Sequence, residues 1–148
     1  MDYVAFVDGS YGEYEGKKMY GSAAIYAPVG TTDWTILKYV GDNPEYLQHR
    51  NVAGEVFAVI SLCNHVLENV KDCSSLLICY DYTGIEMWPT NTWKAKKPLS
   101  IAYKNYMQQI AIPQLKIKFQ HTPGHSGNEG NEIVDKLARE VVYDKLRE

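Results

Sequence analysis

The periodicity of apolar residues changes from strand-like to helical at Val52, and this change leaves the chain few possible folds. Before it lie three runs rich in aromatic and β-branched residues: Tyr3–Val7, Tyr20–Tyr26 and Trp34–Val40. Glycine, proline and aspartate separate the runs, so the pattern predicts three sequential strands with short connections, arranged as an antiparallel meander.

From Val52 to Val70 apolar residues recur at intervals of three and four, which predicts an amphipathic helix. The segments that follow are predicted as a strand, a helix, a strand and a closing helix: Leu76–Tyr80, Ser100–Ile110, Leu115–Phe119 and Asn128–Leu146. Because the sequence has no internal repeat and no linker, residues 1–148 are predicted to form a single domain. Its expected class is α/β, with a mixed sheet flanked by helices.

Four acidic residues occupy positions that suit a functional site. Asp8 is predicted to end the first strand and Asp81 to follow the strand Leu76–Tyr80, and sites in such sheets gather at strand ends. Glu55 lies on the apolar side of its helix, where burial of an unpaired carboxylate costs several kcal/mol or raises its pKa. Asp135 lies inside the last helix. Together the four acids predict carboxylates from separate elements that converge on divalent cations.

Each acid also has a purely structural explanation. Asp8 and Asp81 are typical turn residues, and the helix dipole favours an early-turn glutamate such as Glu55. Asp135 has Arg139 four residues later, which allows a surface ion pair.

The net charge of −3 argues against a nucleic-acid partner, but the charges are unevenly distributed. Between Met87 and Asn128 there is no acidic residue, and six lysines fall there. This positive region is able to bind phosphates locally, although it is equally compatible with an ordinary solvated surface.

The rest of the composition indicates an ordinary intracellular protein. No stretch approaches roughly 18 consecutive apolar residues, so no membrane span is expected. The N-terminus lacks the pattern of a secretory signal, which makes the cytoplasm the expected location. The three cysteines, Cys63, Cys73 and Cys79, have no Cys-x-x-Cys spacing and are expected to be reduced packing residues rather than disulfide partners or zinc ligands.

Four motifs follow one another along nearly the whole chain: FVDGSYGEYEGKKMYGSAAIY (Phe6–Tyr26), RNVAGEVFAVISL (Arg50–Leu62), CYDYTGIEMW (Cys79–Trp88) and GHSGNEGNEIVDKLARE (Gly124–Glu140). In this order they resemble the type 1 ribonuclease H family. The last motif is the most specific, because it combines Gly-His-Ser-Gly with an aspartate, Asp135, ten residues after His125.

The resemblance implies a ribonuclease H-like fold with a five-stranded mixed sheet. It implies that two Mg²⁺ ions, with Mn²⁺ able to substitute, bind to Asp8, Glu55, Asp81 and Asp135, and Asp8 is our choice for the shared ligand. His125 matches the family's mobile-loop histidine, which is thought to assist proton transfer and product departure. Other matched positions lie near the hybrid backbone (Ser10, Arg50 and Asn51) or line the groove for the DNA strand (Trp88 and Trp93), although core packing explains the two tryptophans equally well.

The function implied is endonucleolytic hydrolysis of the RNA strand of RNA–DNA hybrids by two-metal-ion catalysis, with 5′-phosphate and 3′-hydroxyl products. The lysines Lys94, Lys96 and Lys97 are expected to hold the substrate, and the protein is expected to be a monomer without a protein partner. Two alternatives remain open: a catalytically silent hybrid-binding module, and a metal-dependent nuclease of a related fold. The four intact acids count against the first, and the spacing from Gly-His-Ser-Gly to Asp135 counts against the second.

The sequence departs from the family pattern at three places. Asp81 is followed by Tyr82, so a polar residue cannot be assumed at position 82. Val52 stands where many relatives have a polar residue. The stretch Trp93–Ser100 is too short for the long basic handle of some members, and no preceding hybrid-binding module is expected.

Overall fold

Five strands form one mixed sheet in the order β3-β2-β1-β4-β5 in the computed structural model, which describes residues 1–124 and 127–148. The strands are β1 (Asp2–Tyr14), β2 (Lys17–Pro28), β3 (Thr35–Gly41), β4 (Ser75–Tyr80) and β5 (Ile117–His121). The pairs β1–β2 and β2–β3 are antiparallel, whereas β1–β4 and β4–β5 are parallel. The predicted five-stranded mixed sheet is confirmed.

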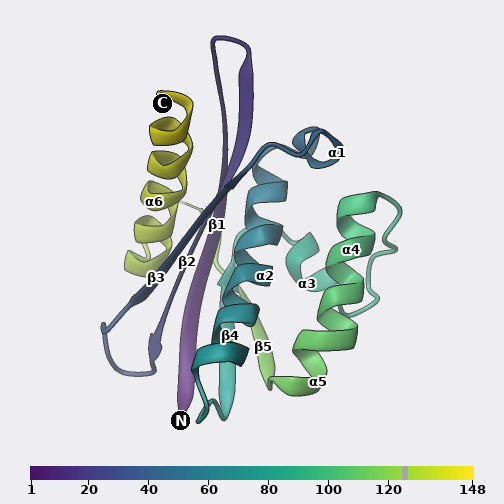
Figure 1. Cartoon of the computed structure of the whole chain (residues 1–148). Coiled ribbons are helices and arrows are strands. Elements are labelled where there is room, and N and C mark those ends of the chain that lie inside the picture. Colours follow the sequence, from purple (N-terminus) through teal and green to yellow (C-terminus); the bar gives the residue numbers. More distant parts are fainter. Residues whose placement is uncertain (125–126) are drawn as a thin grey trace.

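Helices cover both faces of this sheet (Figure 1). The helical segments are α1 (Pro44–Leu47), α2 (Asn51–Asn69), α3 (Gly84–Met87), α4 (Pro98–Tyr106), the π-helical η1 (Met107–Ala111), α5 (Ile112–Gln114) and α6 (Glu129–Leu146). The long helix α2 packs on β1 and β2 from one face, and α6 packs on the same two strands from the other. The helices α4 and α5 lie on the α2 side (Figure 1). None of the helices within residues 1–124 and 127–148 is long and apolar enough to cross a membrane.

Two core clusters separate along β1 because successive side chains on a strand point to opposite faces. Ala5 and Val7 belong to the larger cluster beneath α2, whereas Phe6 belongs to a smaller one beneath α6. Cys63 and Cys79 are buried and Cys73 is partly buried, and all three are free thiols, as expected.

Close approach of α2 to the sheet depends on glycine. A side chain at Gly54 would collide with the Gly21 carbonyl of β2, and one at Gly9 would collide with the Asn51 carbonyl of α2. The hydroxyl of Ser22 donates to the Gly54 carbonyl (2.5 Å) and strengthens the same contact. The first two turns of α2 therefore lie against the backbone of β1, beside Asp8.

Several predicted boundaries were wrong. β1 continues past Val7 to Tyr14, because the chain forms a long hairpin whose turn uses Glu15 and Gly16 with φ of 50° and 80°. Asp8 therefore does not end the strand, but lies two residues after Phe6, the last β1 residue paired with β4. The predicted strand Leu115–Phe119 is displaced to Ile117–His121, since Leu115 is buried as part of the core after α5 and not as a strand residue.

Candidate active site

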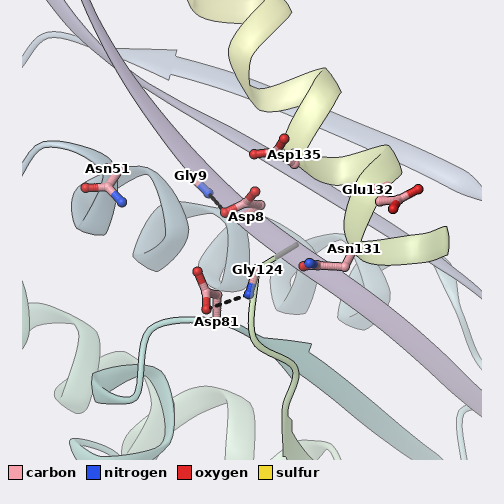
Figure 2. A pocket seen from close by; sticks show the side chains of 8 residues that line it. All are labelled: Asp8, Gly9, Asn51, Asp81, Gly124, Asn131, Glu132 and Asp135. Atoms are coloured by element: carbon pink, nitrogen blue, oxygen red, sulfur yellow. Dashed lines mark hydrogen bonds between the residues drawn. The ribbon is translucent and has the colours of Figure 1, made fainter. Parts of the chain in front are cut away.

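A pocket with a volume of about 220 Å³ opens where β1, the end of β4 and α6 meet (Figure 2). Three of the four predicted acids line it, together with backbone and amide groups from neighbouring segments: Asp8, Gly9, Asn51, Asp81, Gly124, Asn131, Glu132 and Asp135. In Figure 2 the carboxylate of Asp8 lies between those of Asp81 and Asp135. The structure thus brings together acids that are separated by up to 127 positions in the sequence.

Asp8 occupies the floor of the pocket, where β1 has left β4 but still pairs with β2. Its Oδ1 accepts a hydrogen bond from the Gly9 amide (2.8 Å). Burial, together with the nearby Asp135 and Asp81, raises the pKa of the Asp8 carboxyl to about 7, and the hydrogen bond from Gly9 only partly opposes this shift. Asp8 is therefore a carboxyl group whose negative charge is poorly compensated by the protein.

Glu55 lies behind the pocket on α2 and is only 4% exposed, as its place on the apolar side of the helix predicted. Its carboxylate accepts hydrogen bonds from the backbone amides of Asp81 (3.0 Å) and Tyr82 (3.2 Å). Burial, followed by the charge of Asp8, raises the pKa of Glu55 to about 8, and the two amide bonds only partly oppose this shift. The fourth acid is thus joined directly to the segment that carries Asp81.

Asp81 follows β4 and is oriented by the segment after β5. Its Oδ1 accepts a hydrogen bond from the Gly124 amide (3.0 Å), and its backbone carbonyl lies 2.8 Å from Nε2 of His121 (Figure 2 shows the first bond). The end of β5 therefore contacts the backbone of Asp81, and the segment after β5 contacts its carboxylate.

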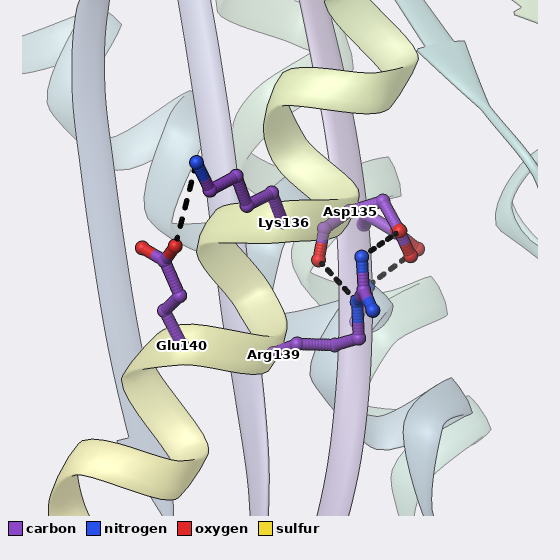
Figure 3. Close-up of polar contacts among 6 residues, drawn as sticks. Asp135, Lys136, Arg139 and Glu140 are labelled. Carbon is purple, nitrogen blue, oxygen red and sulfur yellow. Dashed lines mark hydrogen bonds and ion pairs between the residues drawn. The ribbon is translucent and has the colours of Figure 1, made fainter.

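Asp135 extends from α6 into the pocket and also forms the ion pair that its spacing allowed. Its Oδ2 lies 2.9 Å from Nη2 of Arg139, which is four residues further along the same helix (Figure 3). A second pair on the same helix, Lys136 with Glu140, lies on a different side of the helix from Asp135 and Arg139 (Figure 3). The site and the surface ion pair therefore share one aspartate, and the two explanations of Asp135 are compatible.

The donor set fits a hard divalent cation, because it consists of carboxylate oxygens and no lysine or arginine is among the described residues that line the pocket. As they stand, no three Asp, Glu, His or Cys side chains within residues 1–124 and 127–148 are arranged to hold a metal ion. Three of the acids have other partners: Glu55 accepts from backbone amides, Asp81 accepts from the Gly124 amide, and Asp135 pairs with Arg139.

The other predicted site residues lie outside the acidic pocket, except Asn51. Arg50 precedes α2 with φ 51° and ψ −125°, a conformation that residues other than glycine rarely adopt. Its guanidinium lies over the ring of Tyr11, 5.6 Å from the centroid, beside a second cavity of about 440 Å³. Ser10 lies on β1, and His125 is outside the described residues.

The two predicted tryptophans belong to an aromatic cluster with Tyr82. Trp88 packs against Tyr82 (5.6 Å between centroids) and Tyr103 (6.4 Å), so core packing accounts for much of its position. Trp93 is 39% exposed and meets Trp88 edge to face at 6.1 Å. The three predicted lysines are exposed in the segment between α3 and α4: Lys94, Lys96 and Lys97.

Sequence reasoning missed two groups of residues near the acids. Asn131 and Glu132 line the pocket from the same face of α6 as Asp135, and their spacing of four and three residues before it was an available signal. His121 gave no such signal, because its contact with Asp81 depends on how β5 pairs with β4.

Comparison with known proteins identifies relatives over most of the chain. The family model described as RNase H matches residues 1–143. The ribonuclease H of Prochlorococcus marinus (strain NATL2A) is 29% identical over 124 residues, which cover 78% of this chain and 73% of that protein. The ribonuclease H of Pseudoalteromonas translucida is 37% identical over 73 residues, which cover 45% of this chain and 47% of that protein.

Solved structures share the fold at low sequence identity. The N-terminal ribonuclease H domain of a Mycobacterium tuberculosis protein superposes with a TM-score of 0.72 at 17% identity, covering 95% of this chain and 98% of that one. The ribonuclease H1 of Halobacterium salinarum superposes with a TM-score of 0.66 at 17% identity, covering 97% of this chain and 99% of that one. LC11-RNase H1, which was solved in complex with an RNA/DNA hybrid, superposes with a TM-score of 0.67 at 16% identity, covering 97% of this chain and 99% of that one.

Proposed function

The chain belongs to the ribonuclease H family, whose model spans residues 1–143, and from this premise we propose that it hydrolyses the RNA strand of RNA–DNA hybrids. The observation that carries the proposal is the convergence of Asp8, Asp81 and Asp135 on one pocket, with Glu55 bonded directly behind Asp81. A structural neighbour, LC11-RNase H1, was solved in complex with such a hybrid, which supports this choice of substrate.

The charge of the pocket bears on how it would accept a phosphodiester. Carboxylates and a phosphodiester repel one another by several kcal/mol per close pair at an effective dielectric near 20, so the site needs cations to bind its substrate. We propose that Asp8, Glu55, Asp81 and Asp135 hold two Mg²⁺ ions, which Mn²⁺ can replace. When bound, such ions lower the pKa of the attacking water and stabilise the charge on the leaving oxygen. The expected products carry 5′-phosphate and 3′-hydroxyl ends.

The protein's own residues have distinct proposed roles. Asp8, which lies between the other two pocket acids, is suited to be the shared ligand (Figure 2). His125 is proposed to assist proton transfer and product departure, as its motif implies. Discrimination between RNA and DNA is proposed to rest on the 2′-hydroxyl, which both donates and accepts hydrogen bonds.

Substrate binding is proposed to extend well beyond the acids. Ser10, Arg50 and Asn51 would contact the hybrid backbone on one side of the pocket. The tryptophans and the exposed lysines between α3 and α4 would contact it on the other: Trp88, Trp93, Lys94, Lys96 and Lys97. Because such contacts are made to the backbone of the hybrid and depend on the shape of its groove, the preference for particular base sequences should be weak.

Cleavage of a labelled RNA–DNA hybrid, with and without Mg²⁺, tests the proposal when single-stranded RNA and duplex DNA are run in parallel. Asp8→Asn should reduce cleavage to less than about a tenth of the wild-type rate, because it removes charge at nearly constant volume. Asp144→Asn is the matched control, since Asp144 is exposed on α6 away from the acidic pocket and should leave the rate unchanged. Hybrid binding without cleavage by the wild-type protein would instead identify a catalytically silent binding module.

A further inference from the structure

Asp81 is held in place by a side chain that no sequence motif indicates. We propose that His121 is a positioning residue, which fixes Asp81 in the active site through the hydrogen bond from its imidazole Nε2 to the Asp81 carbonyl. The role presumes the proposed hydrolysis of hybrids, because it concerns one of the four acids assigned to that reaction.

Asp81 needs such a contact because both neighbouring strands have stopped pairing before it. The last β1–β4 pair is Phe6 with Cys79, and the last β4–β5 pair is Tyr80 with His121. Thr122 still donates from its amide to the Tyr80 carbonyl (2.6 Å), but Asp81 lies beyond the ladder. The Asp81 carbonyl therefore has no partner in the sheet ladder, although the Tyr82 amide of the same peptide group donates to Glu55 (3.2 Å).

His121 supplies a partner for this carbonyl from the end of β5. Its Nε2 lies 2.8 Å from the Asp81 carbonyl oxygen, and its ring packs against the Tyr80 ring at 5.5 Å between centroids. A carbonyl oxygen only accepts hydrogen bonds, so Nε2 carries the hydrogen. Because His121 is exposed, burial does not explain why an imidazole stands at this position.

Three polar groups of Asp81 are each held from a different part of the chain. Its amide donates to Glu55 on α2, its carbonyl accepts from His121 on β5, and its Oδ1 accepts from the Gly124 amide. Of these contacts, only the one to His121 can be removed by a substitution that leaves every acid and the backbone intact. Residues that orient metal-binding groups in this way typically contribute roughly 10–100-fold to metal affinity or activity.

A pair of amide substitutions at position 121 isolates this hydrogen bond. The amide nitrogen of glutamine reaches about as far as Nε2 and can donate to the Asp81 carbonyl, whereas that of asparagine reaches only as far as Nδ1. His121→Asn should lower kcat about 10-fold or more, with KM changed less than about threefold, and should weaken Mg²⁺ binding in calorimetry on the order of 10-fold. His121→Gln should keep both quantities within about threefold of wild type.

Gln120→Asn is the control for shortening a side chain at the end of β5. Gln120 is exposed and, by strand alternation, points to the opposite face from His121, so this variant should match the wild type in kcat and Mg²⁺ affinity. Thermal melting of all three variants shows whether the fold is retained, and a variant with a lowered midpoint is compared at a temperature where it is fully folded.

Two results would overturn the proposal. One is wild-type kcat and Mg²⁺ affinity in His121→Asn. The other is an equal loss in His121→Asn and His121→Gln, because the donor at the Nε2 position would then not matter. Failure of the wild type to cleave hybrids would refute the proposed function instead, and the Mg²⁺ affinities of the two variants would still test the positioning role.

Discussion

At the scale of single residues, the site is distinguished by two carboxyl groups that resist ionisation. Burial is the largest cause for both Asp8 and Glu55, and each lies near further acids. The raised pKa values, about 7 and about 8, mean that the folded protein retains protons that the unfolded chain releases near pH 4. The pocket therefore links stability to pH in a predictable direction.

The metal-free protein should be less stable at pH 8.5 than at pH 5.5. Protonation of Asp8 and Glu55 stabilises the folded state fully below the unfolded pKa values near 4, and this stabilisation is lost as the pH rises through about 7 and 8. Urea unfolding in EDTA should show a decrease in the free energy of unfolding on the order of 3 kcal/mol. The double variant Asp8→Asn/Glu55→Gln separates these acids from other titrating groups and should show a much smaller decrease. A wild-type protein that gains stability over this range would contradict the assignment.

The sequence predicted the environment of a residue correctly where its neighbours along the chain determine that environment. The apolar neighbours of Glu55 on its helix correctly predicted its burial. The place of Asp8 at the end of a strand was wrong, because β1 continues in a hairpin with β2 as far as the turn at Glu15 and Gly16, beyond the apolar run that marked the strand in the sequence. The contact between His121 and Asp81 was unpredictable for a different reason, since it depends on the register of β5 against β4, which are distant in the sequence.

At the scale of elements, the contact between α2 and the sheet determines where Glu55 lies. Gly54 and Gly9 permit a backbone-to-backbone approach that any side chain would block. The long, strongly periodic helices were predicted within one or two residues of their observed bounds. The four-residue helices α1 and α3 were missed, since so short a segment shows no period, and the π-helical turn of η1 has no signature in the apolar pattern.

Gly54→Ala should destabilise the protein by about 3 kcal/mol, the upper end of what overpacking usually costs. The direction of the change is diagnostic, because alanine in place of glycine in an unhindered helix would stabilise it by about 1 kcal/mol. Denaturant unfolding measures the difference. Glu68→Ala, on the exposed side of the same helix, is the control and should stay within about 0.5 kcal/mol of wild type. Equal or greater stability of Gly54→Ala would show that α2 can move away from β1 at little cost.

At the scale of the whole molecule, charge is divided between an acidic body and a lysine-bearing segment. The net charge is −3, yet Lys94, Lys96 and Lys97 project into solvent between α3 and α4, outside the acidic pocket. Lysines in that position can hold a polyanion without taking part in the reaction.

Replacement of these three lysines with alanine should weaken hybrid binding and flatten its dependence on salt. Each phosphate contact contributes a slope of about −0.9 in log K against log salt for B-form DNA, so the slope should decrease in magnitude by up to about 2.7. The cleavage rate at saturating substrate should stay nearly unchanged. A triple variant at Lys71, Lys136 and Lys145 removes the same charge elsewhere and serves as the control. The same slope in both variants would make the segment an ordinary solvated surface.

The strained backbone at Arg50 has a consequence for how this position tolerates sequence change. Glycine adopts a φ of 51° without steric cost, whereas arginine there costs on the order of 1–3 kcal/mol. A library of variants screened only for folding should therefore accumulate glycine at position 50. A library screened for hybrid cleavage should retain arginine, whose guanidinium stands over Tyr11 at the proposed backbone contact. Selection for folding and selection for activity should thus favour different residues at position 50.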